Sequence, residues 1–201
     1  MGCKFCKCCC CKKPKAVSVL TVGLDNSGKT TMITRMRTPV GEDSEMDDIV
    51  PTPGFQVERY RKGKFSYTVY DMSGMSKYRK LVCMAACNEK RILCVLSYLA
   101  ILFFAWQWHV YYKEVKAVLY VIDCADTDRL DEARQQLLEL LNHEDIRDRA
   151  GLPVLVMANK MDLPTAIGQF HAAGIMYASS PRCHFVFCRC GEHGRNVEII
   201  G

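Results

Sequence analysis

The segment from Gly23 to Thr31 has the residue types and spacing of a loop that binds phosphate groups. It fits the pattern GxxxxGK[ST] and follows an apolar segment that is rich in β-branched residues. Glycines allow a backbone to wrap closely around phosphates, and the N–H groups at the start of the following helix bind the anion. Lys29 would reach the terminal phosphates, and the Thr30 hydroxyl would ligate Mg²⁺. The predicted phosphate-binding residues are Gly23, Leu24, Asp25, Asn26, Ser27, Gly28, Lys29, Thr30 and Thr31.

Two further polar groups each follow an apolar segment. The first has the spacing DxxG, with Asp71 and Gly74 at its ends, and the second has the spacing NKxD, from Asn159 to Asp162. A carboxylate at the tip of a strand can hold the hydration shell of Mg²⁺, and the Gly74 N–H can contact a terminal phosphate. We therefore expect Asp71 to bind the metal through water.

Hydrophobic periodicity predicts an alternation of strands and helices. A helix is predicted at Leu130–Leu141, and a second helix is predicted at Thr30–Arg37. The first has an apolar face made of Leu130, Ala133, Leu137, Leu140 and Leu141. Strands are predicted at 16–22, Gln56–Arg61, Phe65–Tyr70, Ala117–Ile122 and Val154–Ala158. This order predicts a doubly wound α/β sheet in which ligands bind at the carboxyl ends of the strands.

The three motifs, taken in this order, resemble those of a small GTPase. The resemblance implies the P-loop NTPase fold, α/β with a mixed, mostly parallel sheet and helices on both faces. It also implies GTP and GDP as ligands, Mg²⁺ as cofactor, and hydrolysis of GTP to GDP. Asp162 would pair with the amino group and ring N–H of guanine, while Asn159 and Lys160 would shape the base pocket.

Several longer strings resemble the Arf and Arf-like family. They are GLDNSGKTT, PT-x-GF at 51–55, YDMSG at 70–74, WxxYY at 108–112 and NKMDLP at 159–164. DMSG, YYKE and LLNHEDI are most similar to the ciliary Arf-like branch that is linked to the BBSome coat. The resemblance implies that Thr52 closes on Mg²⁺ and the third phosphate. It also implies a monomer in membrane trafficking, with protein effectors, an exchange factor and a GTPase-activating protein.

The first fifteen residues have the composition of a membrane anchor. Six of the 13 cysteines and five lysines lie there. After removal of Met1, Gly2 is the acceptor for myristoylation, and Cys3 is placed for palmitoylation. One acyl chain binds a protein only weakly to a membrane, so a second chain and the lysines would make membrane attachment stable. A metal-binding cysteine tract and an inert tail are the alternatives. We expect the protein to act at the cytoplasmic face of a membrane, in a cilium or an endomembrane.

The rest of the chain has the composition of a globular domain. At 201 residues with 49% hydrophobic residues, it is long enough to bury one core. The net charge of +5 comes from the N-terminal lysines, so no nucleic-acid-binding face is expected. We expect an anchor at 1–15, a GTPase domain at 16–166 and a divergent C-terminal segment at 167–201.

Four features of the sequence depart from the family pattern, and the first two concern the expected hydrolysis and switching. Met75 occupies the place of the glutamine that orients the attacking water, and a thioether cannot donate a hydrogen bond. Pro53 follows Thr52 and removes a backbone donor. Slow hydrolysis is expected, and a membrane-bound scaffold that has lost switching is the alternative function.

Residues 82–107 form an insertion with an apolar core, Ile92–Trp106. We interpret this insertion as an extra helix, a membrane span or a translated intron.

The C-terminal segment lacks the amphipathic final helix of the family. A strand-like stretch, His184–Phe187, resembles the last strand. Without a final helix, we expect one face of the sheet to be partly uncovered.

Overall fold

The computed structural model describes residues 14–38, 54–72, 74, 111–168, 174, 183–189 and 196–200. These residues form a seven-stranded sheet with the order β2-β3-β1-β4-β5-β6-β7. The two outermost pairs, β2 with β3 and β6 with β7, are antiparallel, and all other pairs are parallel. The strands are β1 (Lys15–Val22), β2 (Phe55–Lys62), β3 (Phe65–Met72), β4 (Ala117–Asp123), β5 (Val154–Asn159), β6 (Cys183–Arg189) and β7 (Asn196–Ile200).

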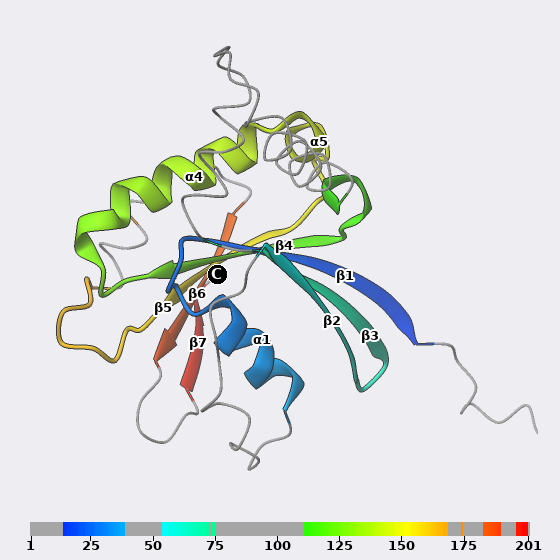
Figure 1. Ribbon diagram of the computed structural model, residues 1–201, viewed down its shortest axis with the longest axis horizontal. Helices are drawn as coiled ribbons and strands as arrows, with labels where there is room; N and C mark the ends of the chain where they lie inside the picture. The colour runs from blue at the N-terminus through cyan, green and yellow to red at the C-terminus, as the bar shows by residue number, and fades with distance from the viewer. Residues whose placement is uncertain are drawn as a thin grey trace, which may run out of the picture.

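Helices lie on both faces of this sheet (Figure 1). Helix α1 (Lys29–Arg37) lies on one face and α4 (Leu130–Asn142) on the other, preceded by the short 3₁₀ helix η2 (Thr127–Arg129). A four-residue helix, α5 (Glu144–Arg147), follows α4. The predicted fold class, a mixed and mostly parallel sheet with helices on both faces, is confirmed.

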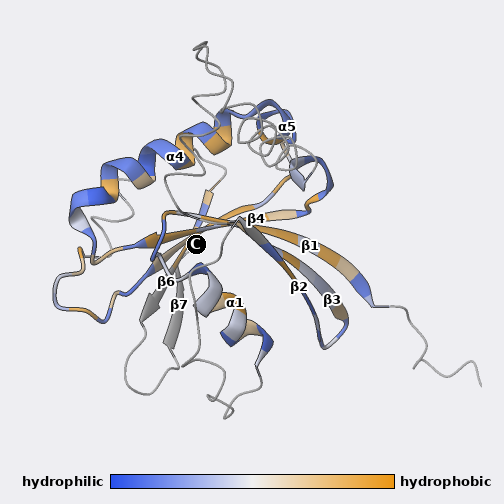
Figure 2. Cartoon of the chain, viewed as in Figure 1, coloured by the Kyte–Doolittle hydropathy of each residue, from blue (hydrophilic) through white to orange (hydrophobic). Residues whose placement is uncertain are grey.

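The central strand β4 contributes to both hydrophobic cores because its side chains alternate between the two faces. Val118, Tyr120 and Ile122 belong to the core beneath α4. Leu119 and Val121 belong to the core beneath α1. Hydrophobic residues follow the central strands, while the outer side of α4 is polar (Figure 2). A strand that is covered on both faces has a continuous run of apolar residues in its sequence, as β4 does.

The apolar face predicted for α4 is confirmed. Its five members, which recur at helical spacing, are all buried against the sheet: Leu130, Ala133, Leu137, Leu140 and Leu141. The Tyr120 hydroxyl donates to the Ala133 carbonyl oxygen at 2.7 Å and so joins the helix to β4. Tyr120 lies in the middle of β4, whose carboxyl end at Asp123 borders the candidate site.

Residues 183–189 and 196–200 extend the sheet. The stretch predicted as strand-like is part of β6, which pairs in parallel with β5 from Cys183 to Phe187. Strand β7 pairs with β6 in antiparallel fashion, and the sequence did not predict it. The insertion at 82–107 lies outside the described residues. Among the residues that the structure describes, no helix is long and apolar enough to cross a membrane.

Candidate nucleotide-binding site

Four neighbouring parallel strands, β3, β1, β4 and β5, bring their carboxyl ends to one edge of the sheet. The residues that follow β1 form the predicted phosphate loop, and α1 begins at the loop's end with Lys29. Gly28 has φ 89°, a left-handed conformation that favours glycine, and a Cβ added there would lie 2.3 Å from Asn159 Nδ2. The first turn of a helix offers N–H groups that the helix does not use internally, which suits an anion.

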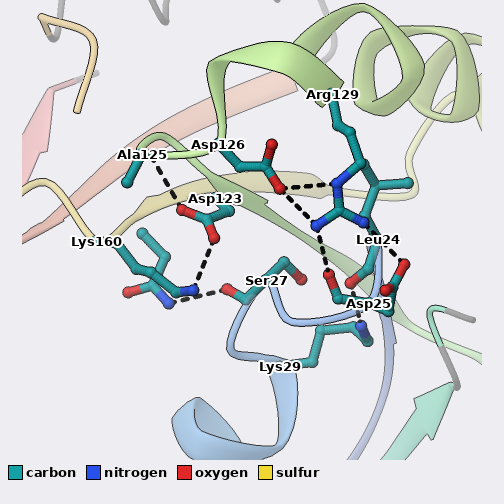
Figure 3. Close-up of polar contacts among 10 residues, drawn as sticks. Leu24, Asp25, Ser27, Lys29, Asp123, Ala125, Asp126, Arg129 and Lys160 are labelled. Atoms are coloured by element: carbon teal, nitrogen blue, oxygen red, sulfur yellow. Dashed lines mark hydrogen bonds and ion pairs between the residues drawn. The ribbon is translucent and has the colours of Figure 1, made fainter. Parts of the chain in front are cut away.

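The Lys29 ammonium lies inside the phosphate loop. The residue is only 6% exposed, and Nζ donates to the Leu24 carbonyl oxygen at 2.6 Å (Figure 3). A buried ammonium is costly unless it is paired or hydrogen-bonded, so the loop holds the charge in place. The arrangement provides a positive charge at the centre of a backbone turn, as phosphate binding requires.

The Ser27 hydroxyl gives a test of whether the loop fits a ligand. Ser27 is fully buried, and its Oγ has no hydrogen-bond partner among the described residues. Buried polar groups normally have partners, so such a hydroxyl within a loop of this shape suits a polar ligand atom. The loop therefore fits the phosphates that the sequence predicts.

Two of the predicted metal-binding side chains lie together, one near the end of β3 and one in the first turn of α1. Asp71, at the end of β3, is 1% exposed, and its Oδ2 accepts a hydrogen bond from Thr30 Oγ1 at 2.6 Å. Carboxylate and hydroxyl oxygens are the ligands that Mg²⁺ takes in phosphate sites. The donor set therefore fits the metal, while the third predicted ligand, Thr52, lies outside the described residues.

Gly74 is packed directly against the phosphate loop. Its carbonyl oxygen accepts a hydrogen bond from the Asp25 N–H at 3.1 Å. A Cβ added at Gly74 would lie 2.2 Å from Asp25 N and 2.3 Å from the Leu24 carbonyl carbon. Only a residue without a side chain can occupy this position, so the end of the DxxG segment packs directly on the backbone of the loop.

Gly74→Ala should separate this segment from the loop, because the obstructing atoms are backbone atoms that cannot turn aside. We expect the affinity for a non-hydrolysable GTP analogue to fall by at least about tenfold, and the affinity for GDP to fall less. The difference follows from the expected contact of the Gly74 N–H with the third phosphate. Titration with fluorescent nucleotides measures both affinities. Gly151→Ala is the control, because its Cβ meets no atom within 4 Å.

The NKxD segment lies beside the phosphate loop. Asn159 Nδ2, at the end of β5, donates to the Ser27 carbonyl oxygen at 2.9 Å. Lys160 adopts a left-handed conformation with φ 60°, and the Leu163 N–H donates back to its carbonyl oxygen at 3.2 Å. Asp162 lies in this turn with an exposed side chain. The structure thus brings the predicted base-binding and phosphate-binding segments together.

Sequence reasoning missed the role of Asp123. Its Oδ2 lies 2.7 Å from Lys160 Nζ, and its Oδ1 accepts a hydrogen bond from the Ala125 N–H at 3.0 Å (Figure 3). Asp123 therefore fixes the Lys160 side chain beside the base-binding turn. The only local signal was a carboxylate at the end of an apolar strand.

The thiol of Cys124, next to Asp123, stays neutral. Burial, with the nearby Asp123 charge, raises the pKa of this thiol to about 12, so the cysteine has a structural role.

Several predicted residues lie outside the described residues. They are Gly2 and Cys3 of the expected anchor, Thr52, and Met75 in place of the usual glutamine. The lipidation, metal and hydrolysis roles expected at these positions stay predictions.

Comparison with known proteins decides the family. Residues 7–95 and 105–184 match the ADP-ribosylation factor family. The chain belongs to the Arf family. Between its two parts the match leaves out residues 96–104, which lie within the insertion expected at 82–107.

The relatives of this Arf-family chain include ADP-ribosylation factor-like protein 6 from two animals. The Danio rerio protein is 40% identical over 155 residues, which is 77% of this chain and 67% of the relative. The Caenorhabditis elegans protein is 31% identical over 153 residues, or 76% and 65%. The chain thus spans about two thirds of the length of the curated relatives that it matches.

A solved structure shares the fold. The Trypanosoma brucei Arl6 BBS3 small GTPase, solved with the nucleotide analogue GppNp, superposes with a TM-score of 0.63 and 30% sequence identity. The alignment covers 86% of this chain and 85% of that one. The chain is therefore an Arf-like small GTPase related to Arf-like protein 6.

Proposed function

We propose that this chain is a molecular switch that binds GDP and GTP, with Mg²⁺, and presents different surfaces in the two states. The observation that carries the proposal is the hydrogen bond from Asn159 Nδ2 to the Ser27 carbonyl oxygen. This bond joins the base-binding segment to the phosphate loop, so one nucleotide can span both. Asp71 and Thr30 supply oxygen atoms suited to the metal, which would neutralise phosphate charge.

The proposed place of action is the cytoplasmic face of a membrane. Gly2 and Cys3 would carry acyl chains, and the lysines among the first fifteen residues would add attraction to anionic lipids. The similarity to Arf-like protein 6 supports a trafficking role at a cilium or an endomembrane. In that role an exchange factor, a GTPase-activating protein and effectors would act on the chain.

We further propose that intrinsic hydrolysis is slow because Met75 cannot align the attacking water. Met75→Gln should raise the single-turnover rate of GTP hydrolysis by about 10- to 100-fold, since a positioned polar group typically contributes this much or more. Release of inorganic phosphate from preloaded protein measures the rate. Met75→Leu, which also lacks a donor, should stay slow. Equal rates for the native protein and Met75→Gln would refute the assigned cause.

The alternative is a membrane-bound scaffold that does not switch, and Met75 and Pro53 favour it. Hydrogen exchange by mass spectrometry separates the two functions. A switch predicts that β2, β3 and the Gly74 segment exchange at different rates when the chain is loaded with GDP and with a GTP analogue. Identical exchange in both loaded states would reject the switch and support the scaffold.

A further inference from the structure

Arg129 lies outside every motif that predicts the nucleotide site, yet it contacts the phosphate loop. It ends η2, 104 positions away from Asp25 in the sequence, and its Nη1 donates to Asp25 Oδ1 at 3.0 Å. The Nη2 atom also lies 3.4 Å from the Asp25 carbonyl oxygen. The same guanidinium donates through Nε to Asp126 Oδ2 at 2.7 Å. Figure 3 shows Arg129 between the two carboxylates, one from the loop and one from the turn after β4.

The Asp25 carboxylate is the one acidic group within the segment Gly23–Thr31. A negative charge in a loop that must hold phosphates repels them, and this repulsion strengthens when a ligand displaces water. The side chain is 45% exposed, so solvent screens it only in part. The Asp25 N–H donates to the Gly74 carbonyl oxygen, which fixes the backbone from which the carboxylate projects.

We propose that Arg129 is a positioning residue of the nucleotide site, which neutralises Asp25 and ties the phosphate loop to the turn after β4. Arg129 does not touch the phosphates. It lets the loop present its amides and Lys29 without an opposing charge. A planar guanidinium suits this role because it can donate to two carboxylates in fixed geometry, which an ammonium cannot do as well.

The inference rests on the proposed nucleotide binding, and it makes a prediction that a merely structural role does not. Without Arg129, the Asp25 charge would repel a triphosphate more than a diphosphate, because the triphosphate carries more negative charge. A general loosening of the loop would weaken both nucleotides equally. The loss of affinity for the triphosphate, divided by the loss for the diphosphate, therefore measures the electrostatic role.

The first test measures dissociation of fluorescent GDP and of a fluorescent non-hydrolysable GTP analogue from the full chain by stopped flow. Arg129→Ala should release the GTP analogue about fivefold faster, and GDP by a smaller factor, which is the upper range for a partly exposed charged contact. In an Asp25→Asn background, Arg129→Ala should accelerate release by less than about threefold, because no charge remains to neutralise. Arg129→Lys should fall between the native protein and Arg129→Ala.

Arg147→Ala is the matched control. Arg147 also pairs with a carboxylate, Asp148 Oδ1 at 2.8 Å, but this pair is exposed and belongs to α5 and the turn after it. Release rates for this variant should stay within about twofold of the native rates. An equal acceleration by Arg129→Ala with and without the Asp25 carboxylate would overturn the proposal, because Arg129 would then act through Asp126 alone.

Hydrogen exchange of the nucleotide-free chain tests the same contact without a ligand. Arg129→Ala should speed deuterium uptake by the peptide that covers Gly23–Thr31, while Arg147→Ala should leave it at the native rate. If the native chain binds no guanine nucleotide, the proposed function fails, and this uptake still decides the role of Arg129. Equal uptake in the native protein and Arg129→Ala would overturn the inference.

Discussion

Lys29→Ala should lower the affinity for both GDP and GTP by at least about 100-fold. The Lys29 ammonium is buried within the phosphate loop and donates to the Leu24 carbonyl oxygen. Its removal takes away the positive charge at the centre of the loop and also a hydrogen bond that shapes the loop. Isothermal titration with each nucleotide in the presence of Mg²⁺ measures the loss.

Lys113→Ala is the control for this charge change. The Lys113 side chain is 69% exposed and lies 3.8 Å from Asp145, a spacing that contributes little to stability. The nucleotide affinity of the Lys113→Ala variant should match that of the native chain. Thermal unfolding of both variants shows whether the fold survives. A folded Lys29→Ala variant that binds GDP within about threefold of the native affinity would contradict the assigned role.

Asp162→Asn should change which base the site accepts. By resemblance, the two carboxylate oxygens accept from the ring N–H and the amino group of guanine, and an amide places a donor against that amino group. We expect the affinity for GDP to fall by about 100-fold and the affinity for xanthosine diphosphate to rise. Xanthine carries a carbonyl where guanine carries the amino group, so the amide N–H then has an acceptor.

Competition between the two diphosphates for a fluorescent nucleotide measures this exchange of preference. Asp148→Asn removes the same charge from an exposed pair with Arg147 and should leave the preference for guanine unchanged. If Asp162→Asn weakens both nucleotides equally, Asp162 supports the turn and does not read the base.

The elements around the site follow closely from the sequence because burial on one or both faces leaves a periodic pattern. The apolar face of α4 was predicted residue by residue, since a helix against a sheet needs apolar residues at intervals of three and four. The observed strand ends differ from the predicted ends by one or two residues: β1 begins at Lys15, and β3 continues to Met72. Pairing with neighbouring strands, which local pattern does not record, sets those ends.

The contacts among side chains at the site were less predictable. Asp123 with Lys160, and Asp25 with Arg129, join segments that are far apart in the sequence. A charged side chain in a loop or at a strand end indicates that it needs a partner but not which one, because the topology of the sheet decides which loops meet. Strand β7 was missed for a similar reason, since pairing with β6 determines its conformation.

The measurement that tests the central claim most directly is titration of the native chain with GDP and with ADP, in the presence of Mg²⁺ and after its removal by a chelator. We expect tight binding of GDP that weakens when the metal is removed, and binding of ADP that is at least about 100-fold weaker. Equal affinity for the two diphosphates, or no binding of either to a folded chain, would contradict this claim.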